Sequence, residues 1–173
     1  MTDMTTPISA ASITGSPTDA QLVEFVTREA RLLDQQRHEE WLELFTPDGH
    51  YWVPLEHGQT DPRLTCSLMY EDLLLLKVRV ERLKGRRTFS QQPQSRCHHL
   101  LQTPMVDVRD EGANRYVTWT PMHYVEARRD EQTLYAAWAT HHLTVVDGRL
   151  RMTLKRVDLV NCDAAFGNIQ LFP

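Results

Sequence analysis

The sequence predicts an α+β domain, with helices in the first half of the chain and hairpin-linked strands in the second half. Apolar residues recur at helical spacing early in the chain, whereas apolar and polar residues alternate after residue 95. Asp147-Gly148 separates two alternating stretches and is the strongest short hairpin signal in the chain. Helices followed by consecutive antiparallel strands favour a layer of helices packed on one face of a sheet.

Two helices are predicted at the start of this domain. Thr18 and Gln21 have capping-box spacing, and the apolar stripe that follows extends a first helix over residues 18–36. Residues 38–45 predict a short second helix, which the turn 47-PDG-49 ends.

The middle of the chain is predicted to contain a strand, a loop and a third helix. Residues 50–55 alternate as a strand does, and residues 56–66 are a polar loop. Residues 67–84 are expected to be helical, because apolar residues line one side at helical spacing. These residues are Leu73, Leu76, Val80 and Leu83.

Four strands are predicted in the second half of the chain. Their expected ranges are 96–109, 115–128, 133–146 and 149–160. Pro121 falls within the second of these strands, so we expect that strand to lie at an edge or to contain a bulge.

Composition excludes several classes of function. At 173 residues, with 41% hydrophobic and 24% charged residues, the chain suits one globular domain. The formal net charge of −4 argues against nucleic acid as a partner, because no basic excess exists to neutralise phosphates. The longest apolar run, residues 73–76, is too short to span a membrane. Three cysteines without a framework spacing fit reduced thiols, so we expect a cytoplasmic protein.

The first 17 residues differ from the rest of the chain. They are rich in Thr, Ser, Ala and Pro and lack the basic start and apolar core of a secretory signal. We therefore expect a disordered lead-in over residues 1–17 and a single domain over residues 18–173.

Cys97 and His99 form a Cys-x-His step, which is the first half of a Rieske iron–sulfur motif. With this composition such a step arises by chance in roughly one chain in seven. The second half, Cys-x-x-His, does not follow Cys66 or Cys162. In a strand Cys97 and His99 share one face and His98 points to the other, so another segment would have to supply further ligands. We predict no metal site here.

The adjacent pair His141-His142 also fails as a metal site. A non-haem iron oxygenase centre needs two histidines and a carboxylate on one face. Neighbouring residues of a strand point to opposite faces, so this pair is split. The sequence also has no Gly-rich phosphate loop and no Gly-x-Ser-x-Gly elbow. No catalytic, cofactor-binding or metal-binding residue is therefore predicted.

Four blocks of sequence nevertheless carry a resemblance. They are 29-EARLLDQQRHEEWLELFTPDGHYWVPL-55, 70-YEDLLLLKVRVERLK-84, 93-PQSRCHHLLQ-102 and 154-LKRVDLVNCDAAFGNIQLF-172. In this order they resemble the small (β) subunit of bacterial aromatic-ring-hydroxylating dioxygenases, the relatives of the biphenyl, naphthalene and benzoate enzymes. The resemblance covers nearly the whole chain after residue 20.

The resemblance implies a cone-shaped α+β fold, in which N-terminal helices pack on a strongly curved mixed or antiparallel sheet. Nuclear transport factor 2, scytalone dehydratase and ketosteroid isomerase share that fold. It also implies a non-catalytic subunit that scaffolds large α subunits, commonly as α3β3, with self-association as a trimer. The Rieske [2Fe–2S] cluster and the mononuclear Fe(II) would then lie in the α subunit, with no cofactor in this chain. Aromatic and apolar residues expected at the contact surfaces are Trp119, Tyr135, Trp138, Phe166 and Leu171.

Three arginines in these blocks are candidates for internal ion pairs, and these are Arg79, Arg82 and Arg96. Their expected partners are carboxylates of the first two helices, such as Glu29, Asp34 or Glu40.

An alternative function stays open at this point. Enzymes of the cone fold use an interior pocket for dehydration or isomerisation, with a buried Asp, His or Tyr as general acid and base. A stand-alone lyase or isomerase of this kind would have to use His98, His99, His123 or Tyr124.

Overall fold

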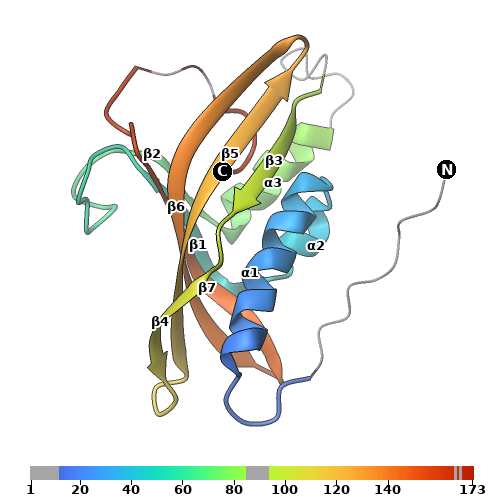
Figure 1. Cartoon of the computed structure of the whole chain (residues 1–173), viewed down its shortest axis with the longest axis vertical. Helices are drawn as coiled ribbons and strands as arrows, with labels where there is room; N and C mark the ends of the chain where they lie inside the picture. Colours follow the sequence, from blue (N-terminus) through green and yellow to red (C-terminus); the bar gives the residue numbers. More distant parts are fainter. Residues whose placement is uncertain (1–11, 85–93, 166, 168) are drawn as a thin grey trace, which may run out of the picture.

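Three helices lie on one face of a curved seven-stranded sheet in the computed structural model, which describes residues 12–84, 94–165, 167 and 169–173 (Figure 1). The elements are α1 (Asp19–Asp34), α2 (His38–Leu42), β1 (Phe45–Pro54), β2 (Ser67–Asp72), α3 (Leu73–Lys84), β3 (Arg96–Leu101), β4 (Met105–Asp110), β5 (Arg115–Arg128), β6 (Glu131–Val146) and β7 (Arg149–Leu159). The predicted α+β class, with helices on one face of the sheet, is confirmed.

The sheet is mixed. Its strand order is β2-β1-β7-β6-β5-β3, and β4 follows β3 along the same edge of β5. β1 and β7 run parallel, whereas the other pairs are antiparallel. The hairpin between β6 and β7 turns at Asp147-Gly148, where both residues have positive φ, as the sequence predicted.

Helix α1 begins where the capping box placed it. The Thr18 side chain accepts a hydrogen bond from the Gln21 amide, and the Gln21 side chain accepts one from the Thr18 amide. The apolar stripe of α1, which includes Leu22, Val26 and Leu33, is buried against the sheet.

The turn predicted at 47-PDG-49 is wrong. Helix α2 ends at Leu42, three residues earlier than expected. Residues 47–49 do not form a turn after it but lie inside β1. Between Phe45 and His50 the register with β7 shifts, so the segment forms a bulge. A Cβ on Gly49 would lie 2.9 Å from the carbonyl oxygen of Met152, so the bulge requires glycine.

The helix predicted over residues 67–84 is wrong in its first third. Residues 67–72 form β2, in which Met69 pairs with Val53 of β1 and is buried. Pairing with β1 outweighs the helical spacing that the sequence shows in this stretch. The remaining residues form α3, whose inner side buries Leu76 and Val80.

The strand predicted over residues 96–109 is broken into β3 and β4. The break contains Pro104, which has no amide to donate to β5. Pro121 lies opposite this break, and its carbonyl accepts a hydrogen bond from the Gln102 amide. β5 is therefore an interior strand without a bulge at Pro121, and the prediction of an edge strand or a bulge is wrong.

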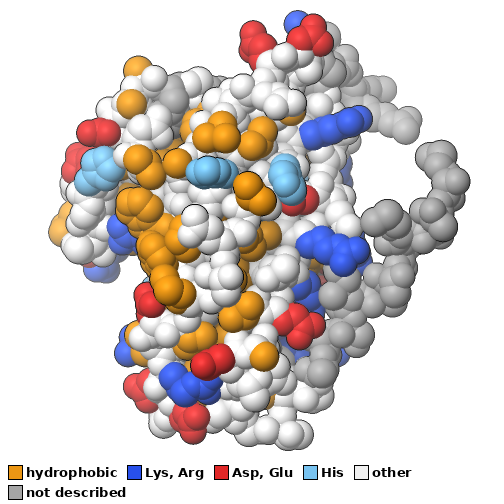
Figure 2. Space-filling view, viewed as in Figure 1, with side chains coloured by type: hydrophobic (Ala, Val, Ile, Leu, Met, Phe, Trp, Pro, Cys, Tyr) orange, Lys and Arg blue, Asp and Glu red, His pale blue; other side chains and the backbone are white. Residues whose placement is uncertain are grey.

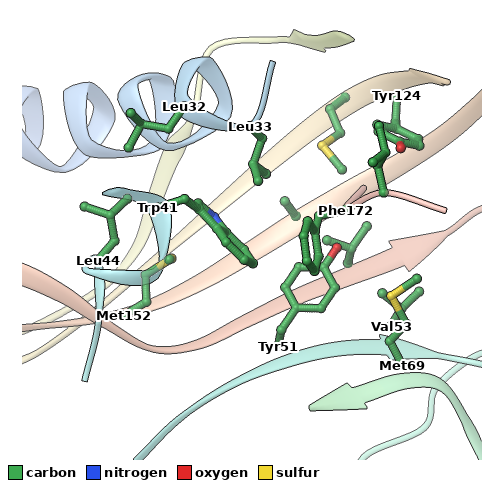
Figure 3. Close-up of a cluster of buried hydrophobic side chains, with 14 of the residues drawn as sticks. Leu32, Leu33, Trp41, Leu44, Tyr51, Val53, Met69, Tyr124, Met152 and Phe172 are labelled. Carbon is green, nitrogen blue, oxygen red and sulfur yellow. The ribbon is translucent and has the colours of Figure 1, made fainter. Parts of the chain in front are cut away.

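The main core lies between the helices and the concave face of the sheet (Figure 3). Trp41 of α2, Tyr51 of β1 and Phe172 near the end of the chain meet at its centre. The Trp41 and Phe172 rings lie 4.6 Å apart between centroids. The last residues of the chain therefore belong to the core.

The division into a lead-in over 1–17 and a domain over 18–173 stays a prediction. Residues 1–11 lie outside the described residues, and the Ile13 amide donates a hydrogen bond to the Gly148 carbonyl. Among the helices of the described residues, none is long and apolar enough to cross a membrane.

Candidate functional site

Residues 169–173, which we call the strap, fill the interior between the helices and the concave face of the sheet. Ile169, Leu171 and Phe172 are each at most 5% exposed. Tyr51 donates a hydrogen bond of 2.6 Å to the Pro173 oxygen. Within the part of the chain that the structure describes, the interior beside Tyr51 is therefore occupied by this chain's own backbone and side chains.

His99 and Tyr124 lie together beside the strap, as the alternative function required. They are opposite each other on β3 and β5, and their ring centroids are 5.1 Å apart. His99 Nδ1 lies 2.7 Å from Asp34 Oδ1, and His99 Nε2 lies 3.1 Å from the Phe172 carbonyl oxygen. Both ring nitrogens of His99 are therefore engaged by neighbouring residues.

Tyr124 is engaged in the same way. Its hydroxyl donates to Glu126 Oε2 at 2.8 Å, and burial, assisted by the Glu126 charge, raises its pKa far above the ordinary value. Glu126 also accepts hydrogen bonds from the backbone amides of Gln170 and Leu171. This carboxylate ties two successive amides of the strap to β5.

The other two pocket candidates are not in the interior. His98 is exposed, and its Nδ1 lies 3.1 Å from Asp34 Oδ2. His123 is exposed on the opposite face of β5 from Tyr124. The structure thus brings together only His99 and Tyr124 from the predicted set.

A second polar cluster lies deeper in the core. Glu29 of α1 accepts hydrogen bonds from Lys155 Nζ at 2.9 Å and Trp41 Nε1 at 2.6 Å. Burial, the largest single effect, would raise the pKa of Glu29, but the charge of Lys155 together with the contacts of His141 and Lys155 outweighs it, and the pKa lies well below its usual range. Both side chains are almost completely buried, so this is an ion pair inside the core.

His141 adjoins this ion pair. Its Nε2 lies 3.5 Å from Glu29 Oε2, and burial lowers its pKa despite the nearby carboxylate. His141 points into the core and His142 to the other face of β6, so the predicted split of the pair is confirmed. The buried hydroxyl of Thr118, opposite His141 on β5, has no hydrogen-bond partner among the described residues.

The partners predicted for Arg79 and Arg96 are wrong, and the partner predicted for Arg82 stays a prediction. Arg79 of α3 forms a bidentate pair with Glu71 of β2, and this contact raises the pKa of Arg79. Arg82 is exposed on α3. Arg96 is exposed at the start of β3, with no carboxylate in ion-pair distance among the described residues. The acids have other partners: Glu29 pairs with Lys155, Asp34 with His99 and Glu40 with Arg37.

In the folded chain Asp34 lies beside Cys97 and His99 of the Cys-x-His step and is a third potential metal ligand. Donor atoms of Asp34, Cys97 and His99 lie within 4.8 Å of one another. Both nitrogens of His99 are already hydrogen-bonded, and burial raises the pKa of the Cys97 thiol to about 12, which disfavours the thiolate that a metal needs. The absence of a metal from this chain stays a prediction.

Sequence reasoning missed Lys155 and Glu126, although a signal for each was present. Lys155 alternates with Val157 and Leu159, which are buried on the inner face of β7. Glu126 alternates in the same way with Tyr124 on β5. A charged residue in register with buried apolar ones must find a partner in the interior.

The opposite face of the sheet carries large apolar side chains that remain accessible. We call this the outer patch, and it comprises Leu100, Met105, Trp119, Pro121, Leu134 and Trp138. Leu100 and Leu134 are 59% and 60% exposed. Hydrophobic side chains and histidines gather over the strands to the left of the helices in Figure 2. Of the residues expected at contact surfaces, Trp119 and Trp138 lie here, Tyr135 and Leu171 are buried inside, and Phe166 lies outside the described residues.

A surface groove of about 770 Å³ lies between α2, α3, the start of β1 and the β6–β7 hairpin. Its apolar floor includes Leu42, Phe45 and Val146. The next residues of α3, Leu74, Leu75 and Val78, are exposed. None of the predicted pocket or ion-pair residues lines this groove.

The sequence and the fold of this chain are both similar to those of known proteins. Residues 28–164 match the family described as "Ring hydroxylating beta subunit". The small subunit of 2-halobenzoate 1,2-dioxygenase from Burkholderia cepacia is 31% identical, over 81% of this chain and 87% of that protein. The crystal structure of the β subunit of benzoate 1,2-dioxygenase from Burkholderia mallei has a TM-score of 0.70 at 23% identity, covering 86% of this chain and 94% of that chain.

The same fold extends beyond that family. An NTF2-like protein with a cystatin-like fold from Novosphingobium aromaticivorans has a TM-score of 0.56 at 14% identity, covering 81% of this chain and 80% of that one. The implied cone-shaped α+β fold is therefore confirmed. Three of the four sequence blocks lie inside the matched residues 28–164, and the fourth begins there. The chain belongs to the family of β subunits of aromatic-ring-hydroxylating dioxygenases.

Proposed function

We propose that this chain is the non-catalytic subunit of a Rieske non-haem iron dioxygenase, and that it scaffolds large α subunits in an α3β3 complex of aromatic catabolism. The observation that carries the proposal is a contrast within the described residues. The interior is filled by the strap, whereas large apolar side chains are exposed on two outer surfaces.

Two separate surfaces suit such an assembly. A ring of three identical chains uses a heterologous contact, in which two different patches of each chain meet. Each chain must also contact a large subunit. The outer patch and the apolar side of α3 with its groove offer surfaces of the required kind.

The iron centres belong, in this proposal, to the large subunit. His99 and Asp34 are bound to each other, and His141 and Glu29 lie in a buried cluster with Lys155. Asp34 also contacts the exposed His98, but both nitrogens of His99 are already hydrogen-bonded and His98 is not among the donor atoms that converge there. The Glu29 cluster holds a single histidine, so neither set offers two histidines and a carboxylate with open positions for iron. We also propose that the complex is cytoplasmic, in keeping with free cysteines.

The test is to co-express the chain with the large subunit encoded beside it and to compare the complex with the chain alone. We expect one complex with equal numbers of both subunits, whose mass fits three of each. Elemental analysis should find iron and a [2Fe–2S] absorption band in the complex, and a colourless, iron-free isolated chain. Stoichiometric iron in the isolated chain, or failure of the two chains to co-purify, would contradict the proposal.

The contacts of His99 and Tyr124 argue against the alternative of a stand-alone lyase or isomerase. Such an enzyme needs an accessible acid or base in the interior. His99 and Tyr124 are instead hydrogen-bonded to Asp34, the strap and Glu126.

A further inference from the structure

The surface groove beside α3 has unpaired basic side chains, whereas most of its acidic side chains are paired. Lys77 of α3 and Arg151 of β7 line the groove together with three glutamates. These glutamates are Glu39, Glu43 and Glu81. Lys84 forms ion pairs with the first and the last of them. No carboxylate of the described residues lies in ion-pair distance of Lys77 or Arg151.

Two further arginines lie beside Arg151, and we call Arg28, Arg149 and Arg151 the basic cluster. Burial lowers the pKa of Arg28, and two nearby carboxylates oppose this effect. The charges of Arg149 and Arg151 lower it further, so the three guanidinium groups lie close enough to repel one another. Within residues 12–84 and 94–165 none of the three forms an ion pair. The groove therefore has a surplus of positive charge at this end.

The apolar surface of the groove continues along α3. The floor includes Leu42, Phe45 and Val146, and Leu74 and Leu75 are 69% and 50% exposed on the helix beside it. An apolar strip that is longer than the groove and bordered by charges suits a segment of another protein, as in complexes where an amphipathic segment lies in a groove.

The surplus of positive charge distinguishes the possible occupants. On β3 and β5 the ionisable side chains of the outer face are all basic, so the outer patch of a second copy complements this groove poorly. They are Arg96, His98, Arg115 and His123. Residues 1–11 contain a single carboxylate, Asp3. We propose, on the basis of the proposed function, that the groove receives a segment of the large subunit that presents apolar side chains to the floor and carboxylates to Lys77 and the basic cluster.

The first test measures how fast two double variants of the full chain associate with the purified large subunit. Lys77→Glu, Arg151→Glu reverses two cations of the groove, and Arg96→Glu, Arg115→Glu reverses two on the outer face, so both change the net charge equally. We expect the groove variant to associate about tenfold more slowly at low salt, with the difference shrinking as salt rises. The outer-face variant should retain most of the rate.

Other outcomes of this test have distinct meanings. An equal loss in both variants would mean that only the overall field acts, and a larger loss in the outer-face variant would place the large subunit on the outer patch. Either result would overturn the inference. If the reversal prevents folding, Lys77→Gln, Arg151→Gln should show a smaller loss in the same direction, and an unchanged rate would also overturn it. Failure of the unsubstituted chain to bind the large subunit would instead contradict the proposed function.

The second test identifies the occupant directly. Val146→p-benzoylphenylalanine places a photo-reactive side chain in the groove of the full chain, and the purified complex is then irradiated. We expect cross-links to one segment of the large subunit, in which Asp or Glu residues flank apolar ones. Cross-links to residues 1–11 of this chain, to a second copy, or to a large-subunit segment without carboxylates would overturn the inference.

Discussion

Strand β5 has two unlike faces. One is buried in the interior and stabilises the chain, and the other is accessible and suited to association. On the inner face Tyr124 and Glu126 are buried and bonded to each other and to the strap. On the outer face Trp119 is half-buried and His123 is exposed. Tyr124 and Glu126 find their partners within the chain, so the inner face contributes stability, although the buried hydroxyls of Thr118 and Thr120 on this face have no hydrogen-bond partner among the described residues. The outer face leaves apolar surface uncovered by the described residues, so it is suited to association.

The largest effect should come from breaking the ion pair in the core. Lys155→Met leaves Glu29 charged and buried without its cation, and we expect a loss of about 3–5 kcal/mol in the free energy of unfolding. Chemical denaturation measures it. The double variant Glu29→Gln, Lys155→Met removes both charges and should recover much of the loss. A single variant as stable as the unsubstituted chain would show that the pair is dispensable.

The next largest effect should appear on the outer face and concern assembly. Trp138→Ala removes a large aromatic side chain from the outer patch, and we expect the contact between subunits to weaken by about 2 kcal/mol. The unfolding free energy of the chain should change less. Sedimentation of the complex measures the effect. Leu64→Ala, in the loop between β1 and β2, removes an exposed apolar side chain outside the patch and is the matched control.

The two faces also differ in how well the sequence predicted them. Alternation along residues 115–128 predicted β5 correctly to the residue, because the strand has one buried and one accessible face. Helix α1, predicted over residues 18–36 from its cap and stripe, spans Asp19–Asp34, so its bounds were predicted to within two residues. β2 was not predicted, because it forms only by pairing with β1, and a single segment carries no information about its partner.

The interior contacts were predicted only in part for the same reason. The sequence identified His99 and Tyr124 as interior candidates, but the strap that lies beside them is 45 or more residues further along the chain. It named Glu29 as one possible partner for the arginines, whereas its actual partner is Lys155. Burial of a charge is visible in the pattern of one element, whereas the identity of its partner depends on how the elements pack.

Acidification should lower the free energy of unfolding by a smaller amount than the substitutions in the core and the outer patch. Burial lowers the pKa of His141, so the folded chain keeps it neutral where the unfolded chain, with a pKa near 6.5, takes up a proton. Stability from this group is therefore complete above pH 6.5 and falls below it, by up to about 1.4 kcal/mol per pH unit. The depressed pKa of Glu29 acts in the same direction below its ordinary value of 4.5.

The difference between the unsubstituted chain and His141→Asn isolates this effect from the other histidines. Denaturation at pH 7.0, 6.0 and 5.5 should show a smaller loss of stability in the variant. His123→Asn, on the outer face, should follow the unsubstituted chain. Equal pH dependence in His141→Asn and the unsubstituted chain would mean that His141 is protonated in the fold.

The smallest effect is expected for Arg96, which the sequence favoured as an internal ion-pair residue. Because Arg96 is exposed and no described carboxylate lies in ion-pair distance, Arg96→Ala should change the unfolding free energy by no more than about 0.5 kcal/mol. Arg79→Ala is the matched comparison, since it breaks the bidentate pair with Glu71 and should cost about 1 kcal/mol or more. Thermal melts of both variants separate the two cases. A larger loss for Arg96→Ala than for Arg79→Ala would mean that Arg96 has a partner outside the described residues. If instead Arg96→Ala melts normally but weakens the complex with the large subunit, the start of β3 extends the contact surface beyond the outer patch.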